Sequence, residues 1–185
     1  MALPLRRSLM TAEELFELPG DDYKYELVEG ELIRMAPTGG EHGVLTVRLG
    51  RLLDEYVEAH DLGIVCGAET GFVLRRTPDT VRAPDAAFIA KDRIPASGVP
   101  KTYWPFPPDV AVEVVSPSDR FDDVQTKVAE YLTAGTRLVW VVNPTTRTIF
   151  VYHSARDVQA LGEEDELNGE EIIPGFRCSV RRVFT

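Results

Sequence analysis

Residues 109–143 read DVAVEVVSPSDRFDDVQTKVAEYLTAGTRLVWVVN, and this segment decides the fold. Its first part, Asp109 to Val115, is nearly all apolar and β-branched, which is typical of a central strand covered on both faces. Ser116-Pro117-Ser118-Asp119 then predicts the start of a helix, and Gly135 predicts its end. Arg137 to Asn143 predicts the next strand. The segment therefore predicts a strand, a helix and a strand at the centre of an α/β protein.

The rest of the chain adds further helices and strands. Thr11 to Glu14 has the form of a capping box and predicts a helix through about Leu18. Apolar residues at helical spacing predict a second helix from Glu41 to about His60. Runs bounded by turn residues predict strands at 23–28, 31–35, 64–74, 81–90, 148–153 and 172–176, with hairpin turns at 29–30 and 75–80. This order predicts an α/β fold whose mixed central β-sheet is flanked by helices, with an extra N-terminal hairpin.

Length and composition predict one domain. The chain has 185 residues, of which 44% are hydrophobic and 27% charged, so we expect a single domain over residues 1–185 with a flexible tail at 1–10. Its apolar runs are far shorter than the ~20 residues that cross a membrane, and no secretory signal is recognisable at its start. Cys66 and Cys178 have no CxxC partner, which favours free thiols in a reducing compartment. We therefore expect a cytoplasmic protein with no membrane partner.

Net charge limits the choice of partner. The 30 acidic and 20 basic residues give a formal net charge of −10, which does not attract a polyanion such as nucleic acid. Six of the acids lie between Glu163 and Glu171 with no basic residue among them, and we expect a solvated loop there. Any contact with DNA must come from local basic groups, for which we expect Arg75, Arg76, Arg82, Lys91, Arg93 and Lys101.

Three acids lie inside or beside predicted strands: Glu26, Asp85 and Glu113. An ionised carboxylate in a core is costly unless it is paired or bound to a cation. Glu113 interrupts an apolar strand, and Asp85 follows Pro84 where a strand begins. If these two carboxylates converge, they are natural ligands for a hard divalent cation such as Mg²⁺.

Lys127 is the corresponding basic residue. On the predicted helix it shares a face with Val124, Val128 and Tyr131, which pack toward the sheet. A lysine on that face either extends to the rim or meets a buried acid, and Glu113 on the preceding strand is the obvious partner.

With these residues the sequence resembles a known family, the Uma-two family of restriction endonucleases in the PD-(D/E)XK nuclease superfamily. The resemblance covers about residues 11–184. It rests on the order and spacing of Tyr25-Glu26-Leu27-Val28-Glu29-Gly30-Glu31-Leu32, His42, Arg82-Ala83-Pro84-Asp85, Val112-Glu113-Val114-Val115-Ser116-Pro117, Lys127 with Tyr131, and Trp140-Val141-Val142-Asn143-Pro144.

The resemblance implies a restriction-endonuclease-like core that hydrolyses DNA phosphodiester bonds with Mg²⁺, or with Mn²⁺ in its place. Asp85, Glu113 and the backbone carbonyl of Val114 would hold the metal. Val115 stands where the superfamily pattern has its lysine, and the resemblance implies that Lys127 supplies that lysine from the next helix. Lys127 would orient the attacking water or stabilise charge on the phosphate.

A second tier of site residues and the assembly are also expected from the resemblance. Glu26, His42 and Tyr131 would support the first tier, for example as a further metal contact or a hydrogen bond behind a ligand. We expect a homodimer or a higher homo-oligomer. The proline-rich residues 91–108 predict a long functional or oligomer-forming loop, in which Tyr103, Trp104 and Phe106 would stack on bases or lie at a subunit interface.

Structural roles remain open for each of these residues. Asp85 has the position of an Asx turn, Glu113 and Lys127 would also make a purely structural ion pair, and His42 would also cap a helix. Two functions of other classes stay open too. One is a catalytically silent member of the fold that acts as an oligomeric DNA- or protein-binding module, and the other is an acidic metal-binding or small-ligand domain.

Overall fold

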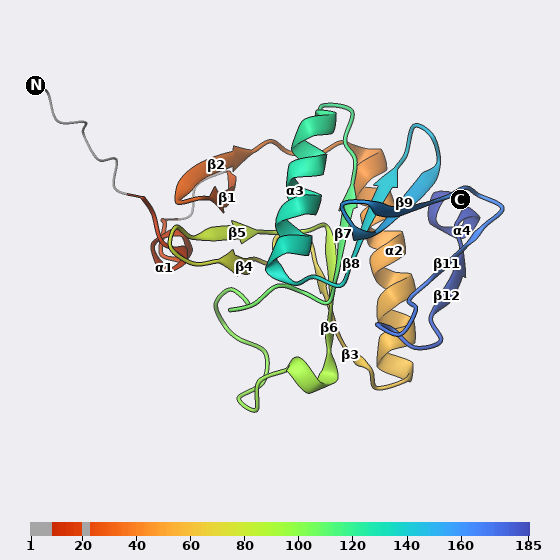
Figure 1. Cartoon of the computed structure of the whole chain (residues 1–185), viewed down its shortest axis with the longest axis horizontal. Coiled ribbons are helices and arrows are strands. Elements are labelled where there is room, and N and C mark those ends of the chain that lie inside the picture. Colours follow the sequence, from red (N-terminus) through yellow and green to blue (C-terminus); the bar gives the residue numbers. More distant parts are fainter. Residues whose placement is uncertain (1–8, 20–22) are drawn as a thin grey trace, which may run out of the picture.

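The structure is a computed structural model and describes residues 9–19 and 23–185 (Figure 1). Its helices are α1 (Ala12–Phe16), α2 (Gly40–Ala59), α3 (Phe121–Ala134) and α4 (Arg181–Phe184), with a 3-10 turn η1 (Lys91–Arg93). Its strands are β1 (Lys24–Val28), β2 (Glu31–Met35), β3 (Gly63–Gly67), β4 (Phe72–Arg75), β5 (Thr80–Arg82), β6 (Ala86–Ala90), β7 (Val110–Val114), β8 (Leu138–Asn143), β9 (Thr148–Ser154), β10 (Asp157–Leu161), β11 (Glu166–Asn168) and β12 (Arg177–Ser179).

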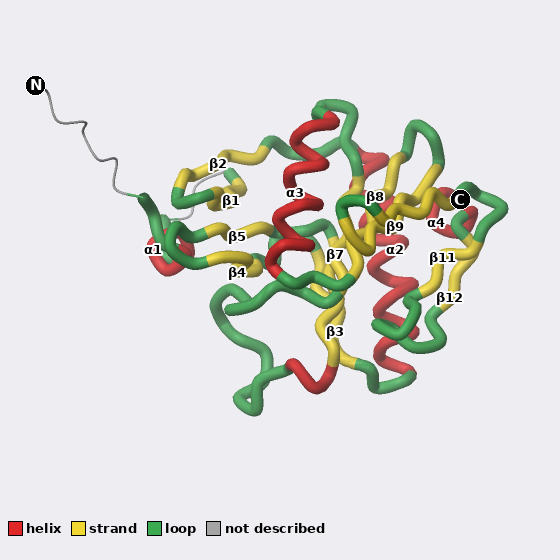
Figure 2. Tube along the Cα trace, viewed as in Figure 1, coloured by secondary structure: helices red, strands yellow, loops and turns green. Residues whose placement is uncertain are grey.

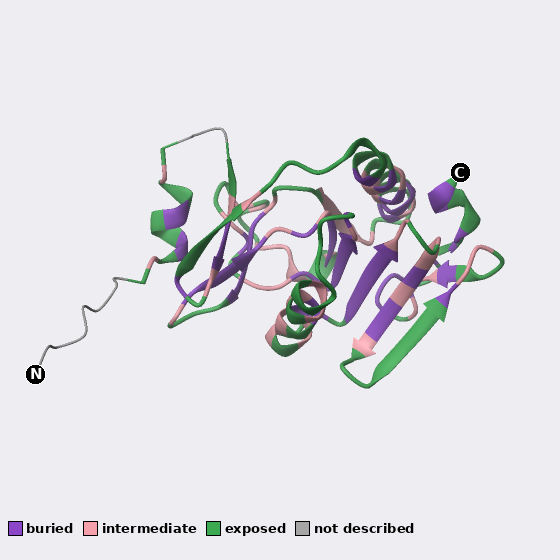
Figure 3. Ribbon diagram, turned by 90° about the horizontal axis from the view of Figure 1, so that it is seen from above, coloured by how far each residue is buried: buried purple, intermediate pink, exposed green. Residues whose placement is uncertain are grey.

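The central sheet has the strand order β10-β9-β8-β7-β6-β3. It is mixed, because β7 and β8 run parallel while the other neighbours run antiparallel. Helix α3 makes the crossover between the two parallel strands and lies on one face of the sheet, while α2 lies on the other (Figures 2 and 3). The expected α/β fold with a mixed central β-sheet flanked by helices is confirmed.

Each face of the central sheet has its own apolar core. One core joins Leu45, Leu49 and Leu53 of α2 to alternate residues of β7 and β8 and to the C-terminal segment. The other joins Tyr131 of α3 to the opposite faces of the same strands and to Trp104. Because β7 is buried on both faces, its side chains are apolar in nearly every position.

A smaller antiparallel sheet, β2-β1-β5-β4, lies beside the central one. The predicted hairpin of β1 and β2 is present, and its turn residues Glu29 and Gly30 have φ of 51° and 79°, the left-handed conformation that a two-residue hairpin turn requires. The predicted long strands at 64–74 and 81–90 are wrong in extent. Each run divides between the two sheets, because Pro84 has no backbone N–H for a ladder and a turn intervenes between β3 and β4.

The C-terminal region departs most from the sequence predictions. The expected strand at 172–176 is a series of turns, whose Ile172, Ile173 and Phe176 are buried in the core under α2. A short apolar run has the same composition whether it forms a strand or a buried turn, so periodicity does not separate them. Strands β10, β11 and β12 and helix α4 are not among the predicted elements.

The acidic segment 163–171 was expected to be a solvated loop. Glu164, Asp165, Glu166 and Glu171 are exposed, but Glu166 belongs to strand β11 and several of the acids form ion pairs. Glu163 binds Arg147 at 2.5 Å, Glu166 binds Arg177 at 2.7 Å and Glu170 binds His153 at 2.6 Å. Glu164 also pairs with Arg181. The basic partners lie on other elements, so the sequence neighbourhood of the acids did not reveal them.

The predictions for the helix ends and the N-terminal tail are confirmed only in part. The capping box at Thr11 and Glu14 is present, and α3 ends at Gly135 with φ of 108°, as predicted. Helix α3 begins later than expected, at Phe121, because Asp119 closes a turn with the backbone N–H of Ser116 instead of capping the helix. Of the expected tail at 1–10, residues 1–8 lie outside the described residues, and the Met10 N–H donates to the Gly30 carbonyl at 2.9 Å.

The proline-rich loop 91–108 packs on its own chain. Trp104 is buried, exchanges backbone hydrogen bonds with Gly71 and Val73, and stacks on Phe72. The placement of Trp104 at a base-stacking surface or a subunit interface is therefore wrong. None of the helices in the described part of the chain combines the length and apolar character that a membrane crossing requires.

Candidate functional site

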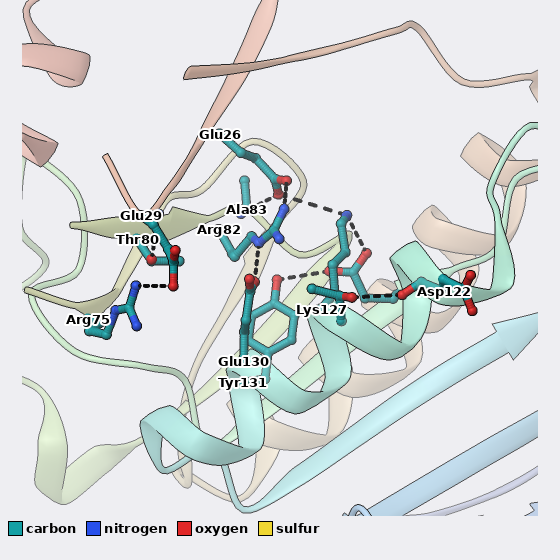
Figure 4. Close-up of polar contacts among 12 residues, drawn as sticks. Glu26, Glu29, Arg75, Thr80, Arg82, Ala83, Asp122, Lys127, Glu130 and Tyr131 are labelled. Atoms are coloured by element: carbon teal, nitrogen blue, oxygen red, sulfur yellow. Dashed lines mark hydrogen bonds and ion pairs between the residues drawn. The ribbon is translucent and has the colours of Figure 1, made fainter. Parts of the chain in front are cut away.

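A cavity of about 350 Å³ opens between the β1–β2 hairpin, the end of β7 and helix α3. Glu26, Glu113 and Lys127 line it, together with Arg82 and the apolar side chains of the hairpin. These residues belong to four separate elements, so the fold brings together two carboxyl groups and two cations that lie far apart in sequence. Figure 4 shows Glu26, Arg82 and Lys127 of this group.

Glu113 is the most perturbed carboxyl group of the site. The residue is 8% exposed, its Oε1 accepts from the Tyr131 hydroxyl at 2.8 Å, and its Oε2 accepts from Lys127 Nζ at 3.0 Å. Burial raises the pKa of Glu113 to about 7, an effect that Lys127 opposes and that the charges of Asp85 and Glu26 increase. Burial therefore favours the protonated form of Glu113. A cation bound beside it would favour the ionised carboxylate instead.

Asp85 lies next to Glu113 across two neighbouring strands. Its backbone N–H donates to the carbonyl of Val112 at 2.9 Å, and its Oδ2 accepts from the backbone N–H of Val114 at 2.7 Å. His42, at the start of α2, contacts the same oxygen through Nε2 at 3.1 Å, and this hydrogen bond raises the pKa of His42. The two strands and α2 thus fix Asp85 beside Glu113.

Lys127 is cationic despite its burial. Burial lowers its pKa, but Glu113 and Glu26 more than offset this effect, so the net shift of the Lys127 pKa is upward. The same burial and the neighbouring carboxylates hold the pKa of Tyr131 well above its ordinary value, so its hydroxyl remains a donor to Glu113.

Glu26 belongs to a second set of ion pairs. Its Oε2 accepts from Arg82 Nη1 at 2.6 Å, and its Oε1 accepts from the Ala83 N–H at 3.1 Å. Arg82 also donates through Nε to Glu130 Oε2 at 2.6 Å. Arg82 is 6% exposed, and burial opposes its charge, yet both carboxylates keep its pKa above the ordinary range.

The carboxylate oxygens of the site are of the type that a hard divalent cation prefers. The four carboxyl groups of Asp85, Glu26, Glu113 and Glu130 outnumber the two cationic side chains, Arg82 and Lys127. Residues 9–19 and 23–185 contain no group of three or more His, Cys, Asp or Glu side chains arranged to hold a metal. Mg²⁺ typically binds through one or two carboxylates and completes its shell with water and substrate phosphate, which a pair such as Asp85 and Glu113 would allow.

Most of the basic residues that were expected to contact DNA form ion pairs within the chain. Arg82 is buried between Glu26 and Glu130, so its placement at a DNA surface is wrong. The other predicted contacts are exposed or half-buried, and all but Lys101 are held in ion pairs with acids of the same chain: Arg75 with Glu29, Arg76 with Glu13 and Asp79, Lys91 with Asp61, and Arg93 with Asp109.

One contributor to the site, Glu130, is not among the residues predicted from the sequence. Glu130 accepts from Arg82 Nε at 2.6 Å and lies three residues after Lys127, on the same face of α3. That spacing is the signal in the sequence that could have identified it.

The raised pKa of Glu113 predicts how the metal-free protein responds to pH. Between its ordinary pKa of 4.5 and about 7, folded Glu113 keeps a proton that the unfolded chain releases. The folded state therefore binds more protons in this window, and the free energy of unfolding should fall as the pH rises through it. Urea unfolding at several pH values with chelator present measures this slope. Glu113→Gln should flatten it, and an equal slope in both proteins would contradict the prediction.

Comparison with known proteins agrees with this architecture. No curated protein matches the chain. The crystal structure described as "a putative nuclease belonging to DUF820" from Anabaena variabilis superposes with a TM-score of 0.82 at 20% sequence identity, over 95% of this chain and 97% of that chain, which shows a shared fold. The model of the Uma2 family, described as "Putative restriction endonuclease", matches residues 12–181. This match spans most of the chain, and the protein therefore belongs to the Uma2 family.

Proposed function

We propose that this protein is a Mg²⁺-dependent endonuclease that hydrolyses DNA phosphodiester bonds. The observation that carries the proposal is the buried contact of Glu113 with Lys127, beside Asp85, at the edge of a cavity. Membership of a family described as restriction endonucleases supports the reaction class, and the fold shared with a protein described as a nuclease is consistent with it.

Each residue of the site has a separate role in the proposed hydrolysis. Asp85, Glu113 and the Val114 carbonyl would hold Mg²⁺, which when bound lowers the pKa of a water and polarises the phosphate. Lys127, whose ammonium Glu113 holds at 3.0 Å, would stabilise the negative charge that develops on the phosphate. Tyr131 orients Glu113 and His42 orients Asp85 through their hydrogen bonds.

Substrate binding should depend strongly on divalent cations. The net charge is −10, and most of the basic residues expected to contact DNA are paired with acids of the same chain. Because DNA affinity comes mainly from neutralised phosphates, binding without metal should be weak. We also propose that the protein forms a homodimer or higher homo-oligomer, which light scattering during gel filtration would measure.

A catalytically silent binding module is the second candidate. The observation in its favour is that both oxygens of Glu113 already have partners in Lys127 and Tyr131, as in a structural ion pair. The two functions differ in whether Asp85 and Glu113 are needed for a measurable reaction.

A cleavage assay separates the two candidates. Wild-type protein should nick plasmid DNA with Mg²⁺ or Mn²⁺, and Asp85→Asn should reduce the rate by at least ~10²-fold, because it removes one of two charged ligands. Asp54→Asn, an exposed change on α2 with the same loss of charge, is the matched control and should cut normally. A wild type that is inactive on single- and double-stranded DNA with either metal favours the silent module.

A further inference from the structure

Lys127 lies between two buried carboxylates that compete for one ammonium group. Its Nζ is 3.0 Å from Glu113 Oε2 and 3.8 Å from Glu26 Oε1. Both acids are buried, so each gains from a nearby cation, and a small movement of the flexible lysine side chain would exchange one partner for the other.

Arg82 is the group that distinguishes the two carboxylates. It donates to Glu26 at 2.6 Å, whereas Glu113 has the neutral Tyr131 hydroxyl as its other side-chain donor. Glu26 therefore already has the Arg82 cation in contact, whereas among residues 9–19 and 23–185 Lys127 is the one cation that contacts Glu113. Lys127 therefore pairs more closely with Glu113, at 3.0 Å, than with Glu26, at 3.8 Å.

Glu130 fixes the orientation of Arg82. The guanidinium is planar and donates in two directions at once, from Nη1 to Glu26 on β1 and from Nε to Glu130 on α3. Figure 4 shows Arg82 between these two acids, with a dashed line that joins Glu26 to Lys127 as well. Lys127, Glu130 and Tyr131 share one face of α3, so one helix carries both the anchor of Arg82 and the lysine that Arg82 affects.

We propose that Arg82 is a positioning residue: by neutralising Glu26 it leaves Lys127 on Glu113, at the reacting end of the cavity. Arg82 would thus act on the reaction through Lys127 without touching substrate. The consequence for catalysis rests on the proposed function, whereas the placement of Lys127 does not.

Crystal structures of metal-free variants test the placement. In Arg82→Gln, Lys127 Nζ should leave Glu113 and move to an ordinary ion-pair distance of about 3 Å from Glu26. In Arg82→Gln/Glu26→Gln, which also removes the competing charge, Lys127 should remain on Glu113. Arg51→Gln removes an exposed arginine that pairs with Glu55 and should leave the site unchanged. Lys127 still on Glu113 in Arg82→Gln would overturn the proposal.

Mn²⁺ affinity provides a second readout. Arg82→Gln should bind Mn²⁺ about 10-fold more tightly, because Lys127 no longer competes for Glu113, whereas a merely loosened site would bind it more weakly. In a Lys127→Met background the same substitution should have little further effect. An equal effect in both backgrounds would mean that Arg82 acts only through its charge, which contradicts the proposal.

Two controls keep the outcomes separate. If Arg82→Gln does not fold, Arg82→Lys replaces it, because this variant keeps a cation but loses the planar group that donates in two directions. Its effect on Mn²⁺ affinity should depend on Lys127 in the same way, with a smaller coupling. Additive effects of the Arg82 and Lys127 substitutions would overturn the proposal. If the wild type binds no Mn²⁺ and cuts no DNA, the proposed function fails, and the position of Lys127 in the metal-free variants still decides the role of Arg82.

Discussion

Glu113→Gln should abolish metal-dependent DNA cleavage, with a loss of at least ~10³-fold, while the protein remains folded. The substitution removes a charged metal ligand and changes the size of the side chain little. Its amide oxygen still accepts from Tyr131 or Lys127, which both contact the wild-type carboxylate. Burial already favours the uncharged form of this group, since the pKa of Glu113 is raised to about 7, so loss of the charge should cost the metal-free fold little.

Calorimetry with Mn²⁺ and a plasmid-nicking assay measure the two effects of Glu113→Gln. Metal affinity and cleavage should fall together, and urea unfolding in chelator should show a protein about as stable as the wild type. Glu55→Gln on the exposed side of α2 is the matched control for loss of a carboxylate. Cleavage that survives Glu113→Gln at the wild-type rate would rule out Glu113 as the metal ligand.

Lys127→Met should separate metal binding from catalysis. The cleavage rate at saturating metal should fall by ~10²–10³-fold, the usual cost of removing one fixed electrostatic donor. At a pH at which Glu113 is ionised in both proteins, metal affinity should instead rise, because the ammonium 3.0 Å from Glu113 no longer repels the cation. The two readouts therefore move in opposite directions, which general damage to the site does not produce.

The pH dependence of Lys127→Met gives a further check. Lys127 holds the pKa of Glu113 below the value that burial alone would impose, so its loss should raise that pKa further. Metal binding measured against pH should then begin at higher pH than in the wild type. Full activity in Lys127→Met, or weaker metal binding at high pH, would show that the lysine has a different role.

The central helix and strands were predictable because their signals are local. Strand β7 is marked by a continuous β-branched run and α3 by its apolar spacing and its terminal Gly135. Lys127 and Glu113 were also predictable as partners, since an acid inside an apolar strand and a lysine on the sheet-facing side of the next helix both need a counter-charge.

Other features depended on contacts between distant segments. As an arginine, Arg82 is of the residue type that contacts DNA at a protein surface, yet it is buried in ion pairs with Glu26 and Glu130. The acids between Glu163 and Glu171 have no basic neighbour in sequence and find their partners on other elements. Ile172 and Ile173 are apolar enough for a strand but form a buried turn.

The sequence by itself determined the order of most of the central elements, the two faces of β7 and α3, and the set of ionisable groups that must meet inside the fold. Those properties follow from periodicity and caps, which act over a few residues. Only the tertiary structure decided which acid holds which cation, because Glu26, Arg82, Glu113 and Glu130 come from four elements. The energy of a buried charge depends on every partner within a few ångströms, and those distances exist only once the sheets and α3 have packed together.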